Sequence, residues 1–217
     1  MVLGIYGASG MGREILETVR TINKADSKYE KIVFVDDNPE LVSVQNVEVI
    51  SLDKAYGSYE KELTLVLAIG EPATRRKVIE RVESMGISFE TVVYPGTAIP
   101  ESTVMGKGCY IGPGCFISCN VTIGDYVLVQ PSVNIGHDCV VEDNAVLSSL
   151  TCLAGNCHIG HDSYLAMNVT AIQGSKVGAD SIVGMASVIQ RDIPDEVIAM
   201  GNPARAMRRN EEHKVFK

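Results

Sequence analysis

Residues 121–160 read VTIGDYVLVQPSVNIGHDCVVEDNAVLSSLTCLAGNCHIG, and an apolar residue returns in this stretch at every sixth position. The spacing extends in both directions, so that sixteen consecutive hexads from Ile99 each begin with an apolar residue, without an insertion or deletion. The next position is Gly in seven of the sixteen hexads, which is typical of tight turns. A period of six predicts a parallel β-helix, in which three hexads complete a triangular coil of 18 residues.

The same repeat explains the cysteines. The fifth position of the hexads carries mostly small residues, as a side chain that points into a narrow coil must be. Four of the six cysteines occupy this position, namely Cys109, Cys115, Cys139 and Cys157, and no two cysteines form a Cys-x-x-Cys pair. We therefore expect them to pack in the core rather than to form disulfides or bind a metal.

A different pattern precedes the repeats. Residues 2–12, VLGIYGASGMG, predict a buried strand and a Gly-rich turn; a helix with one apolar face follows, and a second strand at residues 31–35 ends in Asp36 and Asp37. This is a βαβ unit of the nucleotide-binding kind. Because Ser9 replaces the second glycine of the dinucleotide fingerprint, NAD is disfavoured, but the loop still directs N–H groups towards a phosphate or other anion. An ordinary tight turn is the alternative.

A third strand at residues 63–69 runs into Gly70, and Pro72 opens another helix, whose apolar face consists of Val78, Ile79 and Val82. The expected fold is therefore α/β followed by all-β. We divide the chain into a Rossmann-like domain at residues 1–95, a β-helix at residues 96–194 and a C-terminal cap and tail at residues 195–217.

Composition excludes several classes of partner. The 217 residues carry a net charge of −8, which argues against binding to nucleic acid backbones. No apolar run approaches the roughly 18 residues of a membrane span. The first ten residues, MVLGIYGASG, lack the features of a signal peptide. We expect no membrane partner and a cytoplasmic protein.

His137 is the candidate general base. Asp138 follows it and would orient the imidazole and raise its basicity. One coil further along stands Gly155, and adjacent strands are spaced about 4.8 Å apart, so an open backbone N–H would lie beside the imidazole. A base next to an oxyanion donor is what acyl transfer needs. An exposed turn histidine with an acidic neighbour is the alternative.

The other histidines are weaker candidates. His161 is also followed by an acid, Asp162, but its partner one coil on is Ala179, so we interpret it as structural or as a minor contact. His158 is expected to be a corner or packing residue, and His213 a solvated tail residue. The histidines differ in face or turn phase, which disfavours a zinc site of the kind found in carbonic-anhydrase-type hexapeptide proteins, and no metal is expected.

Four motifs occur in a specific order: GASGMG at residues 7–12, VDD at 35–37, IGEPATRRK at 69–77 and GNPAR at 201–205. With the hexads between the last two, the chain resembles, over roughly residues 1–207, the sugar acetyltransferases of the sialic acid O-acetyltransferase and bacillosamine-pathway acetyltransferase family. The resemblance implies a left-handed β-helix, a homotrimer with active sites between subunits, acetyl-CoA along the β-helix, and a nucleotide-linked sugar in the α/β domain.

The resemblance also implies residue roles. His137 in the segment NIGHD would be the base, and Gly155 in the segment AGN would bind the acetyl carbonyl. The nucleotide-linked sugar would contact Gly7, Ser9 and Gly10 through its phosphates and Asp36 and Asp37 through its base or ribose, with Gly70 and Arg75 nearby. Met11 and Val146 stand where bacillosamine-type enzymes carry histidines, which leaves the acceptor open.

These patterns predict acetyl-CoA-dependent acetylation of the amino group of a nucleotide-activated amino sugar, for surface glycan or polysaccharide synthesis. O-acetylation of sialic acid or a related sugar is the close alternative. A non-catalytic trimeric scaffold is the hypothesis from another class, and the set of His137, Asp138 and Gly155 weighs against it.

Overall fold

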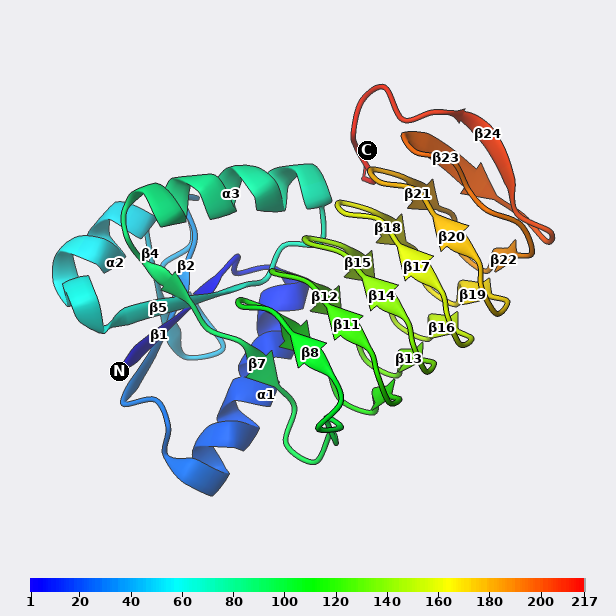
Figure 1. Ribbon diagram of the computed structural model, residues 1–217. Helices are drawn as coiled ribbons and strands as arrows, with labels where there is room; N and C mark the ends of the chain where they lie inside the picture. The colour runs from blue at the N-terminus through cyan, green and yellow to red at the C-terminus, as the bar shows by residue number, and fades with distance from the viewer. Residues whose placement is uncertain (217) are drawn as a thin grey trace.

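The computed structural model describes residues 1–216, in which a sheet flanked by helices stands beside a stack of coils (Figure 1). The sheet has the strand order β3-β4-β2-β1-β5-β6, and β1 is parallel to both β2 and β5. Its strands are β1 (Val2–Tyr6), β2 (Lys31–Val35), β3 (Ser43–Val44), β4 (Val47–Ile50), β5 (Leu63–Leu67) and β6 (Ser88–Phe89). The helices are α1 (Gly10–Asp26), α2 (Leu52–Tyr59), the short 3₁₀ helix η1 (Glu60–Glu62) and α3 (Pro72–Ser84). Within residues 1–216, no helix has the length and apolar character needed to cross a membrane.

The predicted elements of the α/β part are present. β1 and β5 are buried at every position, as expected for strands covered on both faces. The third strand ends at Leu67 rather than Ile69, and α3 begins at Pro72 as predicted. Of the expected apolar face of α3, Ile79 and Val82 are buried, whereas Val78 is only half-buried.

The coils repeat every 18 residues, as the parallel register of Leu128 with Val146 and of Asn134 with Cys152 demonstrates. The β-helix has three faces, named here after one strand of each. The β12 face contains β7 (Val92–Val93), β9 (Tyr110–Ile111), β12 (Leu128–Val129), β15 (Val146–Leu147), β18 (Tyr164–Leu165), β21 (Ile182–Val183), β23 (Val197–Met200) and β24 (Arg205–Arg209). The β13 face contains β10 (Phe116–Ile117), β13 (Asn134–Ile135), β16 (Cys152–Leu153), β19 (Thr170–Ala171) and β22 (Val188–Ile189). The β14 face contains β8 (Val104–Met105), β11 (Thr122–Ile123), β14 (Val140–Val141), β17 (His158–Ile159) and β20 (Lys176–Val177).

The interior of the β-helix is the column of residues that begin the hexads. From Ile111 to Ile189 each of them is at most 3% exposed. The cysteines at the fifth position pack beside them as predicted, and the thiol of Cys109 donates to the carbonyl of Gly124 at 3.1 Å. All six cysteines are free thiols. The core is thus built from aliphatic side chains, with small residues such as Cys, Ser and Thr at the fifth position.

The expected reason for the second-position glycines was wrong. The left-handed backbone conformation lies instead at the fourth position of the hexads, where φ is between 52° and 77° from Gly108 to Ala186. The second-position glycines are required by close approach, because a Cβ atom at Gly124 or Gly136 would stand 2.7 Å from a backbone N of the next coil. Asn and Asp, which tolerate the left-handed region, occupy many of the true turn positions.

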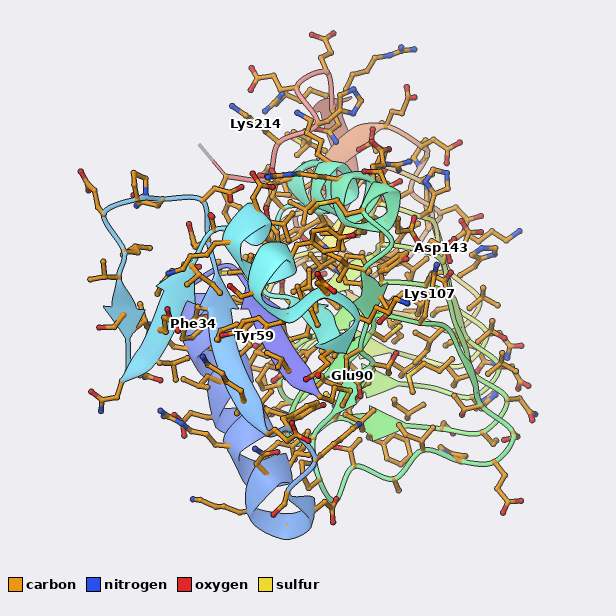
Figure 2. All side chains as sticks on the ribbon, turned by 90° about the vertical axis from the view of Figure 1, so that its left-hand side faces the viewer. Phe34, Tyr59, Glu90, Lys107, Asp143 and Lys214 are labelled. Atoms are coloured by element: carbon orange, nitrogen blue, oxygen red, sulfur yellow. The ribbon has the colours of Figure 1, made fainter. Side chains whose placement is uncertain are left out.

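The α/β part packs on the outer side of the β12 face. Tyr110, Leu128 and Val146 of this face share one hydrophobic cluster with Ile15 of α1, and the hydroxyls of Thr18 and Tyr110 are 2.9 Å apart. Figure 2 shows the two sides of this arrangement, with Phe34 and Tyr59 in the α/β part and Lys107 and Asp143 on the coils. Strand β7, which lies before the expected boundary at residue 96, already pairs with β9 of the coils. The division into three domains stays a prediction.

Candidate active site

His137 lies at the corner between the β13 and β14 faces. Its Nδ1 is 2.7 Å from Oδ2 of Asp138, and Asn120, one coil earlier, donates from Nδ2 to Oδ1 of Asp138 at 3.1 Å. These two hydrogen bonds, from His137 first and Asn120 second, hold the pKa of Asp138 below its ordinary value. An ionised Asp138 accepts a hydrogen bond from Nδ1 of His137, which therefore carries the proton. Nε2 of His137 then has the free lone pair.

Gly155 lies directly against this imidazole. A Cβ atom at position 155 would stand 2.4 Å from both Nε2 and Cε1 of His137, so any other residue there would displace the ring. Among the described residues 1–216, the N–H of Gly155 has no hydrogen-bond acceptor. The corner therefore combines an oriented imidazole with an unused backbone donor, which are the two groups that acyl transfer requires.

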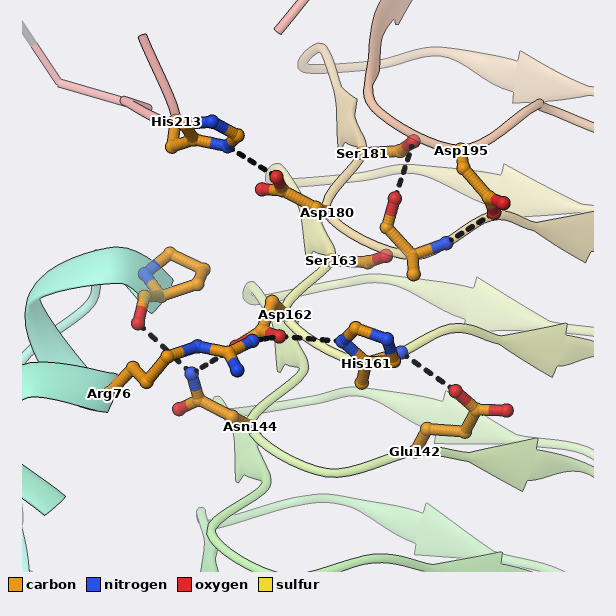
Figure 3. A network of polar contacts seen from close by, with 12 residues as sticks. Arg76, Glu142, Asn144, His161, Asp162, Ser163, Asp180, Ser181, Asp195 and His213 are labelled. Atoms are coloured by element: carbon orange, nitrogen blue, oxygen red, sulfur yellow. Dashed lines mark hydrogen bonds and ion pairs between the residues drawn. The ribbon is translucent and has the colours of Figure 1, made fainter. Parts of the chain in front are cut away.

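The second histidine–aspartate pair, His161 and Asp162, has neither a glycine one coil on nor an unused N–H donor. At His161 the residue one coil on is Ala179, whose N–H already donates to Oδ1 of Asp195 at 2.8 Å. Asp162 is buried and also pairs with Arg76 of α3 (Figure 3). His161 is thus joined to a polar network between α3 and the coils, at the corner between the β14 and β12 faces.

The remaining two histidines differ in part from what was expected. His158 is a strand residue on the outside of the β14 face, not a corner residue, and its Nε2 lies 2.6 Å from Oε1 of Glu142. His213 is not merely solvated, because its Nδ1 contacts the carboxylate of Asp180 (Figure 3).

A cavity of about 620 Å³ opens at the carboxyl edge of the parallel sheet, where α/β proteins bind ligands. Of the residues expected to bind the nucleotide-linked sugar, Gly7, Ser9, Asp36, Asp37 and Gly70 line it. No Lys, Arg or His lines the cavity within the described part of the chain. Anion binding would therefore depend on the backbone N–H groups that begin α1, whose N-cap residue Ser9 makes no side-chain capping bond.

The two aspartates at the end of β2 have separate local partners. Asp36 accepts from the N–H of Ala8 at 2.9 Å and thereby fixes the Gly-rich turn. Asp37 accepts from Arg81 at 2.7 Å. Burial alone would raise the pKa of Asp37, but the bonds from Arg81 and from the N–H of Leu52 outweigh it and lower the pKa. Both aspartates reach the cavity as pre-oriented carboxylates.

Gly10 and Arg75 do not line this cavity. Gly10 is the first residue of α1, directly after Ser9. Arg75 is 1% exposed and points away into the coils, where Nε donates to Oδ1 of Asn144 at 2.9 Å and Nη1 donates to the carbonyl of Ile69 at 2.9 Å. Burial lowers its pKa to about 10. The structure thus gives Arg75 a role in joining α3 to the β-helix.

Several residues of the His137 corner and of the cavity were not identified from the sequence. Asn120 could have been found, because it stands one coil before Asp138 in the repeat. Within the cavity wall, Glu71 directly follows the expected Gly70, whereas Gln130, Tyr164 and Phe216 had no signal, since they come from distant parts of the chain. Met11 lines the cavity, whereas Val146 is buried in the cluster between the α/β part and the coils and does not line it.

The cavity and His137 lie on different sides of one chain. The cavity is bounded by the β12 face, through Tyr164 and the neighbouring Gln130. The corner of His137 joins the two other faces, on the side away from β12 (Figure 1). No residue of the His137 corner lines the cavity, so the two features are separate within one chain.

The fold is that of a class, the hexapeptide-repeat acyltransferases with a Rossmann-like N-terminal part. Residues 2–82 match the family described as "PglD N-terminal domain". Two curated relatives each match about half of the chain. Galactoside O-acetyltransferase of Escherichia coli is 30% identical over 123 residues, which cover 52% of this chain and 61% of that protein. The corresponding enzyme of Lactococcus lactis is 25% identical, and the match covers 54% of its length. The chain thus spans about three fifths or less of these relatives.

Solved structures match nearly the whole chain. Perosamine N-acetyltransferase from Caulobacter crescentus, in complex with CoA and GDP-perosamine, is 28% identical with a TM-score of 0.87, and the match covers 95% of this chain and 97% of that chain. The acetyltransferase domain of PglB from Neisseria gonorrhoeae, in complex with acetyl coenzyme A, is 26% identical with a TM-score of 0.88, covering 95% and 98%. WeeI from Acinetobacter baumannii is 27% identical with a TM-score of 0.89, covering 95% and 100%. Over 95% of its length the chain is thus similar to solved acetyltransferases, and its N-terminal part matches the PglD N-terminal domain.

Proposed function

We propose that the protein transfers the acetyl group of acetyl-CoA to the amino group of a nucleotide-linked amino sugar. The observation that carries the proposal is the imidazole of His137, oriented by Asp138 and lying against the unused N–H of Gly155. The separate cavity at the Gly-rich turn supports a nucleotide-linked acceptor. The CoA and GDP-perosamine bound in the Caulobacter crescentus enzyme support both substrates.

In the proposed reaction, the amine nitrogen attacks the thioester carbonyl while Nε2 of His137 takes its proton. The new C–N bond forms, and the N–H of Gly155 donates to the carbonyl oxygen as negative charge develops on it. The C–S bond then breaks, and the imidazolium returns the proton to the leaving thiolate. Asp138 stabilises the transient positive charge on His137, from which it is 2.7 Å away. Loss of such a base costs about 10²–10⁴ in rate.

The proposed acceptor site is the cavity at the end of β1, β2 and β5. Phosphates would bind the free N–H groups of the first turn of α1 beside Gly7 and Ser9, because no cationic side chain among the described residues lines the cavity. Asp36 and Asp37 at the end of β2 would accept from the ribose or base, as acids at this position do in related folds. Acetyl-CoA and nucleotide sugars are made in the cytoplasm, where we also assign the enzyme.

We further propose that the active unit is a homotrimer. The base and the cavity lie on different sides of one chain, so a complete site needs the cavity of one subunit and His137 of its neighbour. Exposed apolar residues on the β13 face and its corners, Phe116, Leu150 and Ile172, are suited to contact with another copy.

The test is CoA release from acetyl-CoA with a panel of acceptors and with His137→Ala as the control. The panel contains UDP-, GDP- and dTDP-linked 4-amino sugars. Turnover with one of these sugars, lost in His137→Ala while the fold is retained, is the expected result. Turnover that persists in His137→Ala would reject His137 as the base, and silence with every nucleotide-linked amino sugar would reject the acceptor class.

O-acetylation is the second candidate, because a galactoside O-acetyltransferase is 30% identical over 123 residues of this chain. Free and CMP-linked sialic acid and a galactoside therefore belong in the same panel. Turnover with these alone would favour a hydroxyl acceptor. The amino sugar has the stronger support, since the match to the N-acetyltransferase structure includes the α/β part and covers 95% of this chain.

A further inference from the structure

The chain returns to the nucleotide cavity after the last coil. The terminal strap, defined as residues 213–216, begins on the coils, where Nδ1 of His213 contacts the carboxylate of Asp180 (Figure 3). It ends beside the first turn of α3 (Figure 1), where the N–H groups of Val215 and Phe216 donate to Oε1 and Oε2 of Glu71 at 2.8 and 3.3 Å. The strap is thus held at both ends.

The carboxylate of Glu71 accepts hydrogen bonds from the terminal strap and not from its own helix. Glu71 is the N-cap residue of α3, yet its side chain makes no capping bond, and both of its oxygens accept from the strap. The two N–H donors also stabilise the negative charge of the Glu71 carboxylate, which lines the cavity proposed to bind phosphates. Glu71 therefore fixes the position of Phe216.

Phe216 forms part of the cavity wall. Its ring is 5.8 Å from the ring of Tyr164, edge to face at 82°, and its edge is 3.6 Å from the position that a Cβ atom at Gly70 would take. The side chain is nevertheless 54% exposed, so much of this apolar ring is open at the cavity. Together with the ring of Tyr164 and with Gly70 it makes an apolar wall at this end.

The position of this wall indicates which part of a ligand it meets. In the strand order, Asp36 after β2 and Gly70 after β5 lie on opposite sides of β1, which carries the Gly-rich turn. A nucleotide sugar with its ribose at Asp36 and its phosphates at the start of α1 would extend its sugar towards Gly70. Pyranose rings have an apolar C–H face, and an aromatic ring is the side chain that packs against it.

We propose that Phe216, positioned by Glu71, is a specificity-determining residue that packs against the sugar ring of the nucleotide-linked substrate. This inference rests on the proposed function and deepens it, because it assigns the sugar end of the cavity. Phe216 contributes to binding of the sugar and not to binding of the nucleotide.

The experiment compares calorimetric dissociation constants for a nucleoside diphosphate and its sugar conjugate, using GDP with GDP-perosamine and UDP with a UDP-linked 4-amino sugar. In Phe216→Ala we expect affinity for the bound conjugate to fall about fivefold to tenfold, with less than about twofold change for the free diphosphate. Phe216→Tyr should retain the wild-type values. Met207→Ala, an exposed apolar residue on β24 outside the cavity lining, is the control and should change neither constant.

Glu71→Gln tests the positioning role. We expect the same sugar-selective loss, smaller than in Phe216→Ala, and faster hydrogen exchange at the N–H groups of Val215 and Phe216, which a residue that merely lined the cavity would not change. Equal losses for conjugate and diphosphate, or no loss in Phe216→Ala, would overturn the inference alone. Wild-type protein that binds none of the four ligands would overturn the proposed acceptor site, and the inference with it.

Discussion

The imidazole of His137 lies against the backbone of Gly155, with Nε2 only 2.4 Å from the place that a Cβ atom at position 155 would take. The two residues are one coil apart in the chain, and the coil spacing alone brings them together. Gly155 is therefore required twice, once for the space that the ring fills and once for the N–H that lies beside it.

Gly155→Ala should lower kcat about 10²-fold or more, because the added methyl group displaces the imidazole from the unused N–H donor. The KM for acetyl-CoA should change much less, since the substitution acts on the reacting groups. Steady-state CoA release with the acceptor found by the panel measures both constants, and the melting temperature reports on the fold.

Gly57→Ala is the matched control for this substitution. Gly57 lies in α2 and has no atom within 4 Å of the position that its Cβ would take, so the same chemical change should leave kcat unaltered. A Gly155→Ala variant with wild-type kcat would show that the close contact between ring and backbone has no part in the reaction.

Asn120 supports the same corner from the other side. Asn120→Ala removes the hydrogen bond of 3.1 Å to Oδ1 of Asp138, so the pKa of Asp138 should rise towards its ordinary value and the carboxylate should orient His137 less well. Because a hydrogen bond to a charged group contributes about 1.5–3 kcal/mol, we expect kcat to fall about tenfold. The pH profile of kcat measured between pH 5 and 9 separates this loss from a shift in protonation.

Asn168→Ala controls for the backbone effect of the substitution. Asn168 has the same hexad position and φ of 60° against 56° at Asn120, but its side chain makes no hydrogen bond within residues 1–216. Both variants should lose similar stability, and only Asn120→Ala should lose activity. Equal kcat in the two variants would remove Asn120 from the site.

The repeat made the β-helix and its local site predictable. Once the period of 18 residues is known, Gly155 must stand beside His137 and Asn120 beside Asp138, because parallel strands in register stack residues one coil apart. Such contacts depend on sequence spacing alone. The same spacing did not predict which hexad position has the left-handed backbone conformation. Glycine at the second position allows the close approach of the next coil, whereas Asn or Asp at the fourth position adopts the positive φ of the turn.

Contacts between the two parts of the chain could not be predicted in this way. The family resemblance places Arg75 near the nucleotide-linked sugar, but it is buried against Asn144, 69 residues away. Phe216 reaches Glu71 over 145 residues. No periodicity relates these positions, because the orientation of α3 against the coils is set by packing of the whole α/β part on the β12 face.

The separation of cavity and base predicts complementation between inactive variants. His137→Ala removes the base, and Thr74→Trp fills the cavity from an exposed position of α3. If each site combines the cavity of one subunit with His137 of another, co-expression of the two variants should restore roughly a quarter of the sites, since each site draws its two subunits at random. Activity of the mixed protein, purified through two different affinity tags, measures this.

The control for complementation is a chain that carries both substitutions, mixed with His137→Ala. No pairing of these chains contains an intact base, so it should stay inactive. Restored activity in the first mixture requires a shared site, whereas an inactive first mixture of stable oligomers would mean that cavity and base act within one chain.

Glu83 near the end of α3 predicts a pH-dependent contribution to stability. Its carboxylate accepts from Nζ of Lys107 at 2.7 Å and from the hydroxyl of Tyr126, and these bonds, Lys107 first, lower the pKa of Glu83 from its ordinary 4.5. A carboxylate whose pKa is lower in the folded state stabilises the fold fully above the unfolded pKa, and this stability is lost as the pH falls through the folded pKa. Glu83→Gln should therefore lower the melting temperature by about 1–3 °C at pH 7, and the difference from wild type should shrink below pH 4.5. Glu40→Gln, whose carboxylate makes no ion pair within residues 1–216, should match wild type throughout, and a difference at Glu83 that stays constant down to pH 3 would contradict the assignment.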